Sequence, residues 1–483
     1  MPLILGSQSA VSTGYSIDNC SRWNVEGRME RDFAAGDPDT WTFSCWFKGG
    51  PWTTGYPKIL QGADPAVAAD NADTSLQVNT SDKLAFQNWN SGDDGTRITT
   101  QSVVDVGAWY HIVFVYDSGN GTPADRIKMY LNGVQITAFA TEVDPTVDDD
   151  SNFNKSSPQC TMHLGSHFGR DTGGRFRGYM AEVAYVDGTV YAASDFGEFD
   201  EDSPTIWKPK DFSGDITFGT NGLYLDFADS ANLGADVSGN GNDLTESGFT
   251  AADQGTDTPT NNFCTLNPLD NFYASSTFSE GNCKITTDSS AYAYNTGTVG
   301  LSAGLWYWEM KDVAAAGSGD EVIGIAAAPT TSTTDWVGKT SETFAYYGNT
   351  GQSYTNDVAS SYGDTWGESD IIGVFLDLNA NKLYFSKNGT VQNSGTGISI
   401  TAAASTATGL YFPAMSDYHS AGSGIYAFNF GGCSAFDVTS ANQDANGYGN
   451  FEYSPSDGGS ASFDGSAKDF LAICTKNLGS DGG

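Results

Sequence analysis

The feature that most constrains the fold is an alternation of apolar and polar residues with a period of two. It is clearest in residues 304–310, 370–377 and 384–389, which are separated by Gly, Asn and Asp. Successive side chains of a β-strand point to opposite faces, so the pattern predicts strands with one buried face. Long amphipathic helical patterns are missing from the sequence. The chain is therefore predicted to be all-β.

The first half of the chain shows the same alternation. Strand-like runs occur at residues 41–48, 108–117, 127–134 and 176–185, and Asn132 with Gly133 is a strong hairpin signal. A chain of 483 residues is too long for one ordinary sandwich. We predict two tandem antiparallel β-sandwiches with a short linker and a C-terminal tail.

The predicted segments are a docking peptide (1–14), a first sandwich (15–210), a connecting unit with a linker (211–261), a second sandwich (262–435) and a tail (436–483). Residues 223–227 within the connecting segment are either an added strand of the first sandwich or part of a small unit. Residues 253–260 are polar and contain a proline, which is typical of a linker. Residues 474–477 echo residues 264–267, so the tail is expected to return a strand to the second sandwich.

The charge balance excludes one class of partner. The chain has 59 acidic and 22 basic residues, giving a formal net charge of −37. A field of that sign repels phosphate backbones, and no cluster of Lys and Arg interrupts it, so we expect no nucleic-acid binding. A solvated acidic surface is the simplest explanation of this composition, although calcium binding or tolerance of high salt would use it too.

The cysteines and the N-terminus indicate where the chain folds. Seven cysteines are widely spaced without a C-x-x-C motif, which favours buried thiols and folding in a reducing cytoplasm. The first residues, Met1 to Gly6, have no basic start, so no signal peptide is predicted. No run approaches the roughly 20 apolar residues of a membrane span, and no membrane insertion is expected.

Motif order in both halves resembles known families. "WTFSCWFK", "WYHIVFVYD" and "FRGYMAEVAYVDG" follow one another as in the laminin-G-like, concanavalin-A-type jelly roll. "LWYWEM", "IIGVFLD", "LYFSKNG" and "FNFGG" resemble the SPRY domain, a recognition module without catalytic chemistry. The whole arrangement is similar to virion structural proteins of marine tailed bacteriophages. The resemblance implies a binding or structural protein rather than an enzyme.

Candidate ligand contacts are aromatic residues in loop-like sequence. Flat aromatic rings stack on the C–H faces of sugars, while Asn and Asp bind hydroxyl groups. In a sandwich most aromatic residues belong to the core, so each candidate has packing as its alternative role. The candidates are Trp52, Tyr56 and Trp89 in the first sandwich and Tyr354, Tyr362 and Trp366 in the second.

Calcium is the cofactor that the sequence suggests. Asp236, Ser238, Asn240 and Asn242, with Gly241, reproduce the start of an oxygen-rich loop that wraps a hard cation. The Glu expected at the twelfth position is replaced by Ser247. An ordinary turn rich in Asp and Asn explains the same residues.

Catalysis is not predicted. Residues 198–202 approach the carboxylate pattern of jelly-roll glucanases, but Glu198 and Asp202 would lie about 13 Å apart on a regular strand. A retaining glycosidase needs its carboxyl groups about 5–5.5 Å apart. His163 and His167 would be similarly distant on strands, too far apart to share a metal.

The sequence thus favours a non-enzymatic protein of the virion surface, of the tail-fibre or appendage type. Its expected partners are a host cell-surface polysaccharide and other virion proteins, and it is expected to be a homo-oligomer or present in many copies. One alternative is a capsid decoration or head-fibre protein without a receptor role. Another is a polysaccharide hydrolase that uses Glu198.

Overall fold

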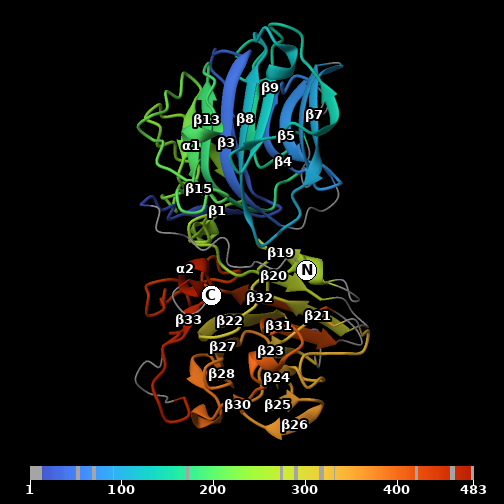
Figure 1. The fold of residues 1–483 in the computed structure, drawn as a ribbon, viewed down its shortest axis with the longest axis vertical. Coiled ribbons are helices and arrows are strands. Elements are labelled where there is room, and N and C mark those ends of the chain that lie inside the picture. The colour runs from blue at the N-terminus through green and yellow to red at the C-terminus, as the bar shows by residue number, and fades with distance from the viewer. Residues whose placement is uncertain are drawn as a thin grey trace. The chain divides into compact units, whose positions relative to one another are not determined.

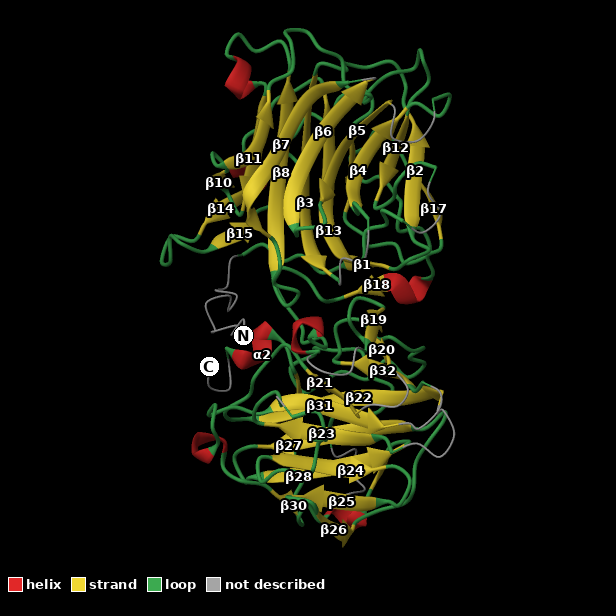
Figure 2. Cartoon of the chain, turned by 90° about the vertical axis from the view of Figure 1, so that its right-hand side faces the viewer, coloured by secondary structure: helices red, strands yellow, loops and turns green. Residues whose placement is uncertain are grey.

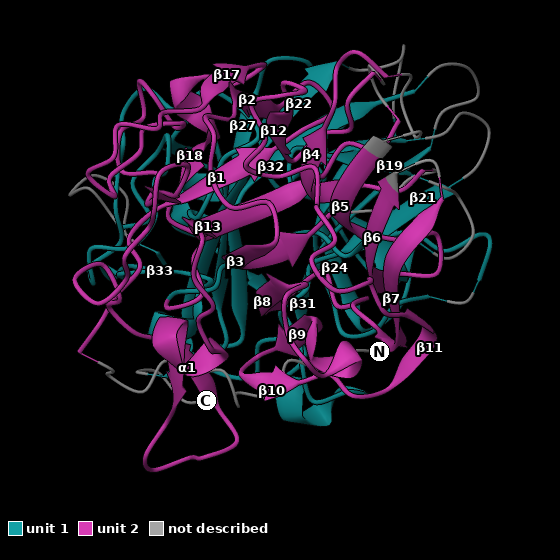
Figure 3. Ribbon diagram, turned by 90° about the horizontal axis from the view of Figure 1, so that it is seen from above, with its two compact units in different colours: residues 1–10, 261–483 teal, residues 11–260 magenta. Residues whose placement is uncertain are grey.

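The computed structural model, shown as a ribbon in Figure 1, describes residues 14–50, 55–67, 72–90, 92–169, 173–271, 276–287, 292–314, 320–330, 332–418, 423–456 and 463–479. Strands dominate both halves of the chain (Figure 2), which confirms the predicted all-β class with two antiparallel sandwiches. Clustering of contacts divides the chain into two compact units, Val11–Thr260 and Asn261–Gly483 (Figure 3). The expected docking peptide lies outside the described residues, apart from Gly14.

Two antiparallel sheets form the first unit. The first sheet has the order β10–β9–β8–β3–β13–β1–β18, with β16 beside β13. Its strands are β1 (Cys20–Trp23), β3 (Thr40–Gly49), β8 (Trp109–Asp117), β9 (Ile127–Leu131), β10 (Val134–Gln135), β13 (Gly178–Asp187), β16 (Leu223–Leu225) and β18 (Gln254–Gly255).

The second sheet of this unit has the order β11–β7–β6–β5–β4–β12–β2–β17. Its strands are β2 (Arg28–Asp32), β4 (Lys58–Ala63), β5 (Ala72–Val78), β6 (Lys83–Asn90), β7 (Asp93–Ser102), β11 (Phe139–Val143), β12 (Thr161–Leu164) and β17 (Thr245–Ser247). A small hairpin of β14 (Gly197–Phe199) and β15 (Trp207–Pro209) follows the short helix α1 (Ala193–Phe196).

The core of the first unit lies between these two sheets. Phe86 of β6 stacks on Phe114 of β8 with ring centroids 4.4 Å apart, which joins one sheet to the other. The outer face of the first sheet is also buried, because Phe196, Phe212 and Phe218 pack over it. The outer face of the second sheet instead carries polar side chains.

Of the predicted connecting unit and linker (211–261), residues 211–260 belong to the first sandwich. Strand β16 pairs with β13, β17 with β2, and β18 with β1. Asp253 forms an ion pair of 2.9 Å with Arg22, and Asp257 one of 2.8 Å with Lys48. All four side chains are buried, so the polar residues that resemble a linker are the counter-charges of buried cations.

The second unit is a sandwich of a nine-stranded and a six-stranded sheet. The larger contains β19 (Thr277–Ser279), β20 (Lys284–Thr286), β22 (Leu305–Ala314), β27 (Ile371–Asp377), β28 (Lys382–Lys387), β29 (Thr390–Val391), β30 (Ile398–Ser399), β32 (Ile425–Asn429) and β33 (Leu471–Ala472). The smaller contains β21 (Tyr292–Thr296), β23 (Val322–Ala326), β24 (Thr343–Tyr347), β25 (Gln352–Thr355), β26 (Val358–Ser361) and β31 (Phe412–Tyr418).

The C-terminal tail packs on the second sandwich. Strand β33 pairs in parallel with β22, and the backbone N–H of Cys264 donates to the carbonyl of Ile473 at 2.9 Å. Glu309 of β22 is buried and accepts the backbone N–H groups of Glu452 and Tyr453 at 3.0 and 2.7 Å. Helix α2 (Thr475–Leu478) then ends the described part of the tail.

All seven cysteines are buried and none forms a disulfide, as the sequence predicts. Within the described residues, no helix has the length and apolar character needed to cross a membrane.

Candidate functional site

The outer face of the second sheet carries an unbroken row of polar residues. The strand register places one residue from each of seven neighbouring strands on this row, namely Thr96, Gln87, Ser75, Gln61, His163, Glu30 and Thr245. The adjacent row contains Phe86, Leu76, Leu60, Leu164 and Met29, which are buried in the core. Alternation along each strand therefore gives the sheet one apolar face and one polar face.

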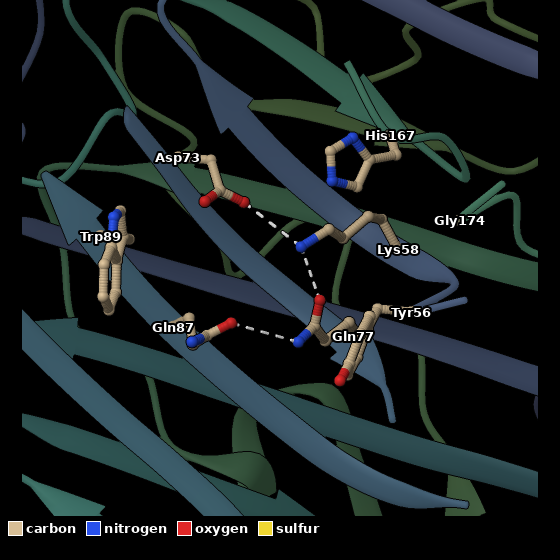
Figure 4. A pocket seen from close by; sticks show the side chains of 8 residues that line it. All are labelled: Tyr56, Lys58, Asp73, Gln77, Gln87, Trp89, His167 and Gly174. Carbon is tan, nitrogen blue, oxygen red and sulfur yellow. Dashed lines mark hydrogen bonds and ion pairs between the residues drawn. The ribbon is translucent and has the colours of Figure 1, made fainter. Parts of the chain in front are cut away.

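A cavity of about 360 Å³ opens on this polar face. We call it the amide pocket, and its lining side chains are shown in Figure 4: Tyr56, Lys58, Asp73, Gln77, Gln87, Trp89, His167 and Gly174. Strands β4, β5 and β6 supply most of them, and His167 with Gly174 comes from the loop after β12.

Lys58 organises the floor of the amide pocket. Its Nζ donates to Ser75 Oγ at 2.8 Å and to Gln77 Oε1 at 2.5 Å, and it lies 3.2 Å from Asp73 Oδ2. Asp73 Oδ2 also accepts from Gln61 Nε2 at 3.0 Å. Lys58 is only 4% exposed, so its charge is compensated within the floor. These bonds hold the side chains of the floor in fixed positions.

Two aromatic rings border this floor. In Figure 4, Trp89 and Tyr56 lie on either side of the group formed by Asp73, Lys58 and Gln77. Trp89 pairs with Asp73 near one end of β5. Tyr56 lies two residues before Lys58, and Lys58 pairs with Gln77. Gln77 lies about 13 Å from Asp73 along β5. Tyr56 is 51% exposed and Trp89 is half-buried, so both rings are partly accessible.

Amide groups are the second ingredient of the pocket. Gln77 Nε2 donates to Gln87 Oε1 at 3.4 Å, which leaves the Gln87 amide donor directed away from this bond. Aromatic faces beside amide and carboxylate groups suit a ligand that is apolar on one side and rich in hydroxyl groups on the other.

The six aromatic candidates from the sequence fall into four groups. Tyr56 and Trp89 line the amide pocket, although Trp89 lies in β6 and not in a loop. Trp52 lies outside the described residues. Tyr354 is half-buried in β25 and packs edge-on against Trp336 at 5.0 Å.

Tyr362 and Trp366 differ from the expected surface position. They are 7% and 4% exposed and belong to the core of the second sandwich. The Tyr362 hydroxyl accepts the backbone N–H of Phe385 at 3.1 Å. Both rings are packed in the core, so neither is available as a ligand platform.

In the candidate calcium loop, side-chain groups that could bind a cation form hydrogen bonds within the protein. The Asp236 carboxylate accepts the backbone N–H groups of Tyr224, Ser238 and Asn242 and the Ser238 hydroxyl. Asn240 and Asn242 donate their side-chain amides to backbone carbonyls of residues 219–222. No group of three or more His, Cys, Asp or Glu side chains with metal-binding geometry occurs among the described residues. The geometry is that of a self-satisfied turn.

The acidic string 198–202 does not form a pair of facing carboxylates. Lys208 Nζ lies 3.3 Å from Glu198 Oε1 and 3.4 Å from Asp200 Oδ2, so one lysine bridges both carboxylates. Asp200 also accepts the backbone N–H groups of Asp202 and Ser203. These contacts close a turn beside β14 and β15.

Sequence reasoning missed most of the pocket floor. Lys58, Asp73, Gln77 and Gln87 lie in strands whose exposed faces are polar, so their segments lack the apolar alternation of the other strands. The usable signal was the alternation of Asp73, Ser75 and Gln77 with Thr74, Leu76 and Val78, which places three polar side chains on one face.

Each of the two sandwiches matches a known family. Residues 30–194 match the family described as the concanavalin A-like lectin/glucanases superfamily, and residues 305–432 match the SPRY domain. The chain carries a concanavalin-A-like domain and a SPRY domain. Both domain types are typically binding or interaction modules, which supports a binding role. The amide pocket lies within the concanavalin-A-like domain.

The solved structures that match parts of the chain are distant in sequence. The SPRY domain of human HERC1 is 18% identical, covering 36% of this chain and 99% of its own, with a TM-score of 0.29. A candidate carbohydrate-binding protein from Bacteroides ovatus is 15% identical, covering 36% of this chain and 44% of its own (TM-score 0.27). A SAP-like pentraxin from Limulus polyphemus is 16% identical, covering 37% and 80% (TM-score 0.26). No curated protein matches the chain.

Proposed function

We propose that this protein binds carbohydrate through the amide pocket of its concanavalin-A-like domain. The observation that carries the proposal is the pairing of two partly accessible rings, Tyr56 and Trp89, with a fixed floor of amide and carboxylate groups. Sugar rings stack on the aromatic faces, while hydroxyl groups bind the Gln87 amide and the oxygens of Asp73. The pocket performs recognition and no chemical step.

Affinity at one such site is modest, because a shallow site removes little surface from water. Many copies on one particle raise the effective affinity without better contacts, since the second binding event becomes intramolecular. A weak single site is therefore sufficient for a protein that is present in many copies on a particle and binds a polysaccharide.

A glycan array probed with the full-length protein tests the proposal. We expect the wild type to retain a subset of polysaccharide fragments, and Trp89→Ala to weaken that binding by about 10-fold. Trp336→Ala is the matched control, because Trp336 is also half-buried but lies in the SPRY domain. Equal losses in both variants, or no retained glycan, would contradict a sugar site at the amide pocket.

We further propose that the protein is part of a bacteriophage virion surface, of the tail-fibre or appendage type, where it attaches the particle to host glycan or to a neighbouring virion protein. Support comes from the joining of two recognition-type sandwiches, from the strongly acidic composition and from the resemblance of motif order to phage virion proteins. Mass spectrometry of purified particles and labelling with antibody in electron microscopy test the location. Labelling of the capsid alone, without glycan binding, would favour a decoration protein.

A polysaccharide hydrolase is the enzymatic alternative. The bridging of Glu198 and Asp200 by Lys208 disfavours it, because one lysine holds both carboxylates and they do not face each other as a catalytic pair. Release of reducing ends from a bound polysaccharide, abolished by Glu198→Gln, would establish the hydrolase instead.

A further inference from the structure

A second hollow lies on the same polar face as the amide pocket. It encloses about 530 Å³ between β2, β12 and β17, and we call it the arginine trough. His167 borders both hollows, so a single ligand can extend from one to the other. The trough contributes charged groups where the amide pocket contributes aromatic and amide groups.

The trough contains two buried polar atoms that the protein itself leaves unsatisfied. His163 Nε2 and Ser166 Oγ have no hydrogen-bond partner among the described residues, although His163 and Ser166 are only 6% and 2% exposed. Both residues line the trough. Native proteins pair nearly all buried polar atoms, so two unpaired atoms in residues that line one cavity point to a group, from a ligand or from solvent, that completes them.

His163 is held in a defined state. Its Nδ1 lies 3.5 Å from Glu30 Oε2, which orients the ring and turns Nε2 away from that carboxylate. Burial, followed by the charges of Arg28 and His167, lowers the pKa of His163 to about 4. The ring is therefore neutral at neutral pH, and its Nε2 is available for a hydrogen bond.

The charge of the trough is opposite to that of the chain. Three of the eight arginines, Arg28, Arg31 and Arg175, line it together with Glu30 and Asp32, a local balance of 3 − 2 = +1. The formal charge of the chain is −37. Arg28 Nε lies 4.0 Å from Glu30 Oε2, beyond hydrogen-bond distance, and has no hydrogen-bond partner among the described residues.

Arg175 is a positioning residue. Its Nη1 donates to the carbonyls of Glu26 and Gly27 at 3.3 and 3.1 Å, which ties the loop after β12 to the chain before β2. This contact fixes one wall of the trough next to Arg28. A cation is disfavoured here, because the lining carries three guanidinium groups and two carboxylates.

We propose that the arginine trough binds an anionic substituent, a carboxylate or a sulfate ester, of an acidic polysaccharide whose chain continues over the amide pocket. The proposal rests on the carbohydrate-binding function proposed above and specifies its ligand class. Arg28 meets the anion with its planar guanidinium, and Ser166 donates its hydroxyl to the same group. His163 Nε2 binds a neighbouring hydroxyl group.

Three dextrans of the same length test the proposal: unmodified dextran, carboxymethyl-dextran and dextran sulfate. Binding is measured by biolayer interferometry with the full-length protein at constant physiological salt. We expect at least one charged dextran to bind about 10-fold or more tightly than unmodified dextran, even though the net charge of the protein repels polyanions. The charged dextran that binds identifies the substituent as carboxylate or sulfate.

Variants separate the trough from general electrostatics. Arg28→Gln should remove the preference for the charged dextran, whereas Lys128→Gln, with the same charge change in β9 away from both hollows, should keep it. Ser166→Ala should weaken charged-dextran binding several-fold without lowering the melting temperature of the ligand-free protein, because its hydroxyl has no partner to lose. If Ser166 had only a structural role, Ser166→Ala would lower the melting temperature and leave charged-dextran binding unchanged.

The outcomes distinguish this inference from the proposed function. Equal binding of charged and neutral dextran, equal losses in Arg28→Gln and Lys128→Gln, or no binding of any dextran would overturn the anionic site. Retention of neutral glycans on the array, lost in Trp89→Ala, would leave the amide pocket intact in that case. Absence of neutral-glycan binding together with absence of a preference for charged dextran would overturn both the amide-pocket proposal and the anionic site.

Discussion

Glu321 is a buried residue of the SPRY domain whose charge state affects the stability of that domain. It precedes β23 and is 4% exposed, and its Oε2 has no hydrogen-bond partner among the described residues. Burial raises its pKa to about 8, and the charges of Asp312 and Asp417 act in the same direction. The pKa of Asp312 is likewise raised, to about 6, by burial and then by Asp417.

This shift predicts how stability depends on pH. The folded state holds the Glu321 proton up to about pH 8, whereas the unfolded chain releases it near its ordinary pKa of 4.5. The contribution of Glu321 to the free energy of unfolding is therefore fully present below about pH 4.5. It decreases as the pH rises and stops decreasing above about pH 8. We expect Glu321→Gln to stabilise the SPRY domain by roughly 2 kcal/mol at pH 8.5 and by little at pH 4.5. Urea unfolding at both pH values measures the difference, and a pH-independent effect would contradict the buried charge.

Single residues also show what a sequence can and cannot reveal. Tyr56 and Tyr362 both occur in loop-like sequence, yet one ring is 51% exposed and the other 7%. Neighbouring residues cannot distinguish them, because burial is decided by strands distant in sequence, such as β28, whose Phe385 donates its N–H to Tyr362. The structure of the candidate calcium loop is likewise decided by distant residues, because Asn240 and Asn242 donate to backbone carbonyls about 20 residues earlier in the chain.

Strands with alternating apolar residues were predictable, and strands with a polar outer face were not. β3, β8, β22 and β27 carry strong alternation because their inner faces fill the cores. β4, β5 and β6, which build the amide pocket, carry polar residues on an open face and were not recognised from the sequence. The polar row across the second sheet arises from register between strands, and a single sequence contains little information about register.

The tail elements allow a prediction about the limits of the SPRY domain. Phe451 is fully buried and packs edge-on against Tyr307 of β22 at 5.0 Å, although it lies beyond the residues that match the SPRY family. We expect Phe451→Ala to destabilise the SPRY domain by about 3–4 kcal/mol, because it leaves a cavity under β22. Tyr448→Ala, at the partly buried edge of the same cluster, should cost less. Similar unfolding midpoints for both variants would mean that the tail is dispensable for the domain.

Each compact unit has its own main hydrophobic core among the described residues. We expect calorimetry of the full chain to resolve two unfolding transitions. Leu76→Ala should lower only the transition of the concanavalin-A-like domain, and Phe385→Ala only that of the SPRY domain, each by about 3 kcal/mol of unfolding free energy. A single transition shifted by both variants would show that the two cores unfold as one cooperative unit.

The central claim is that ligand binds on the outer face of the second sheet of the concanavalin-A-like domain. Hydrogen–deuterium exchange of the full chain, with and without a glycan retained on the array, tests that location directly. We predict slower exchange in peptides covering β4, β5, β6 and β12 when the glycan is present, with the SPRY peptides unchanged. Protection confined to the SPRY loops around residues 349–362, with no change in β4 to β6, would contradict the claim.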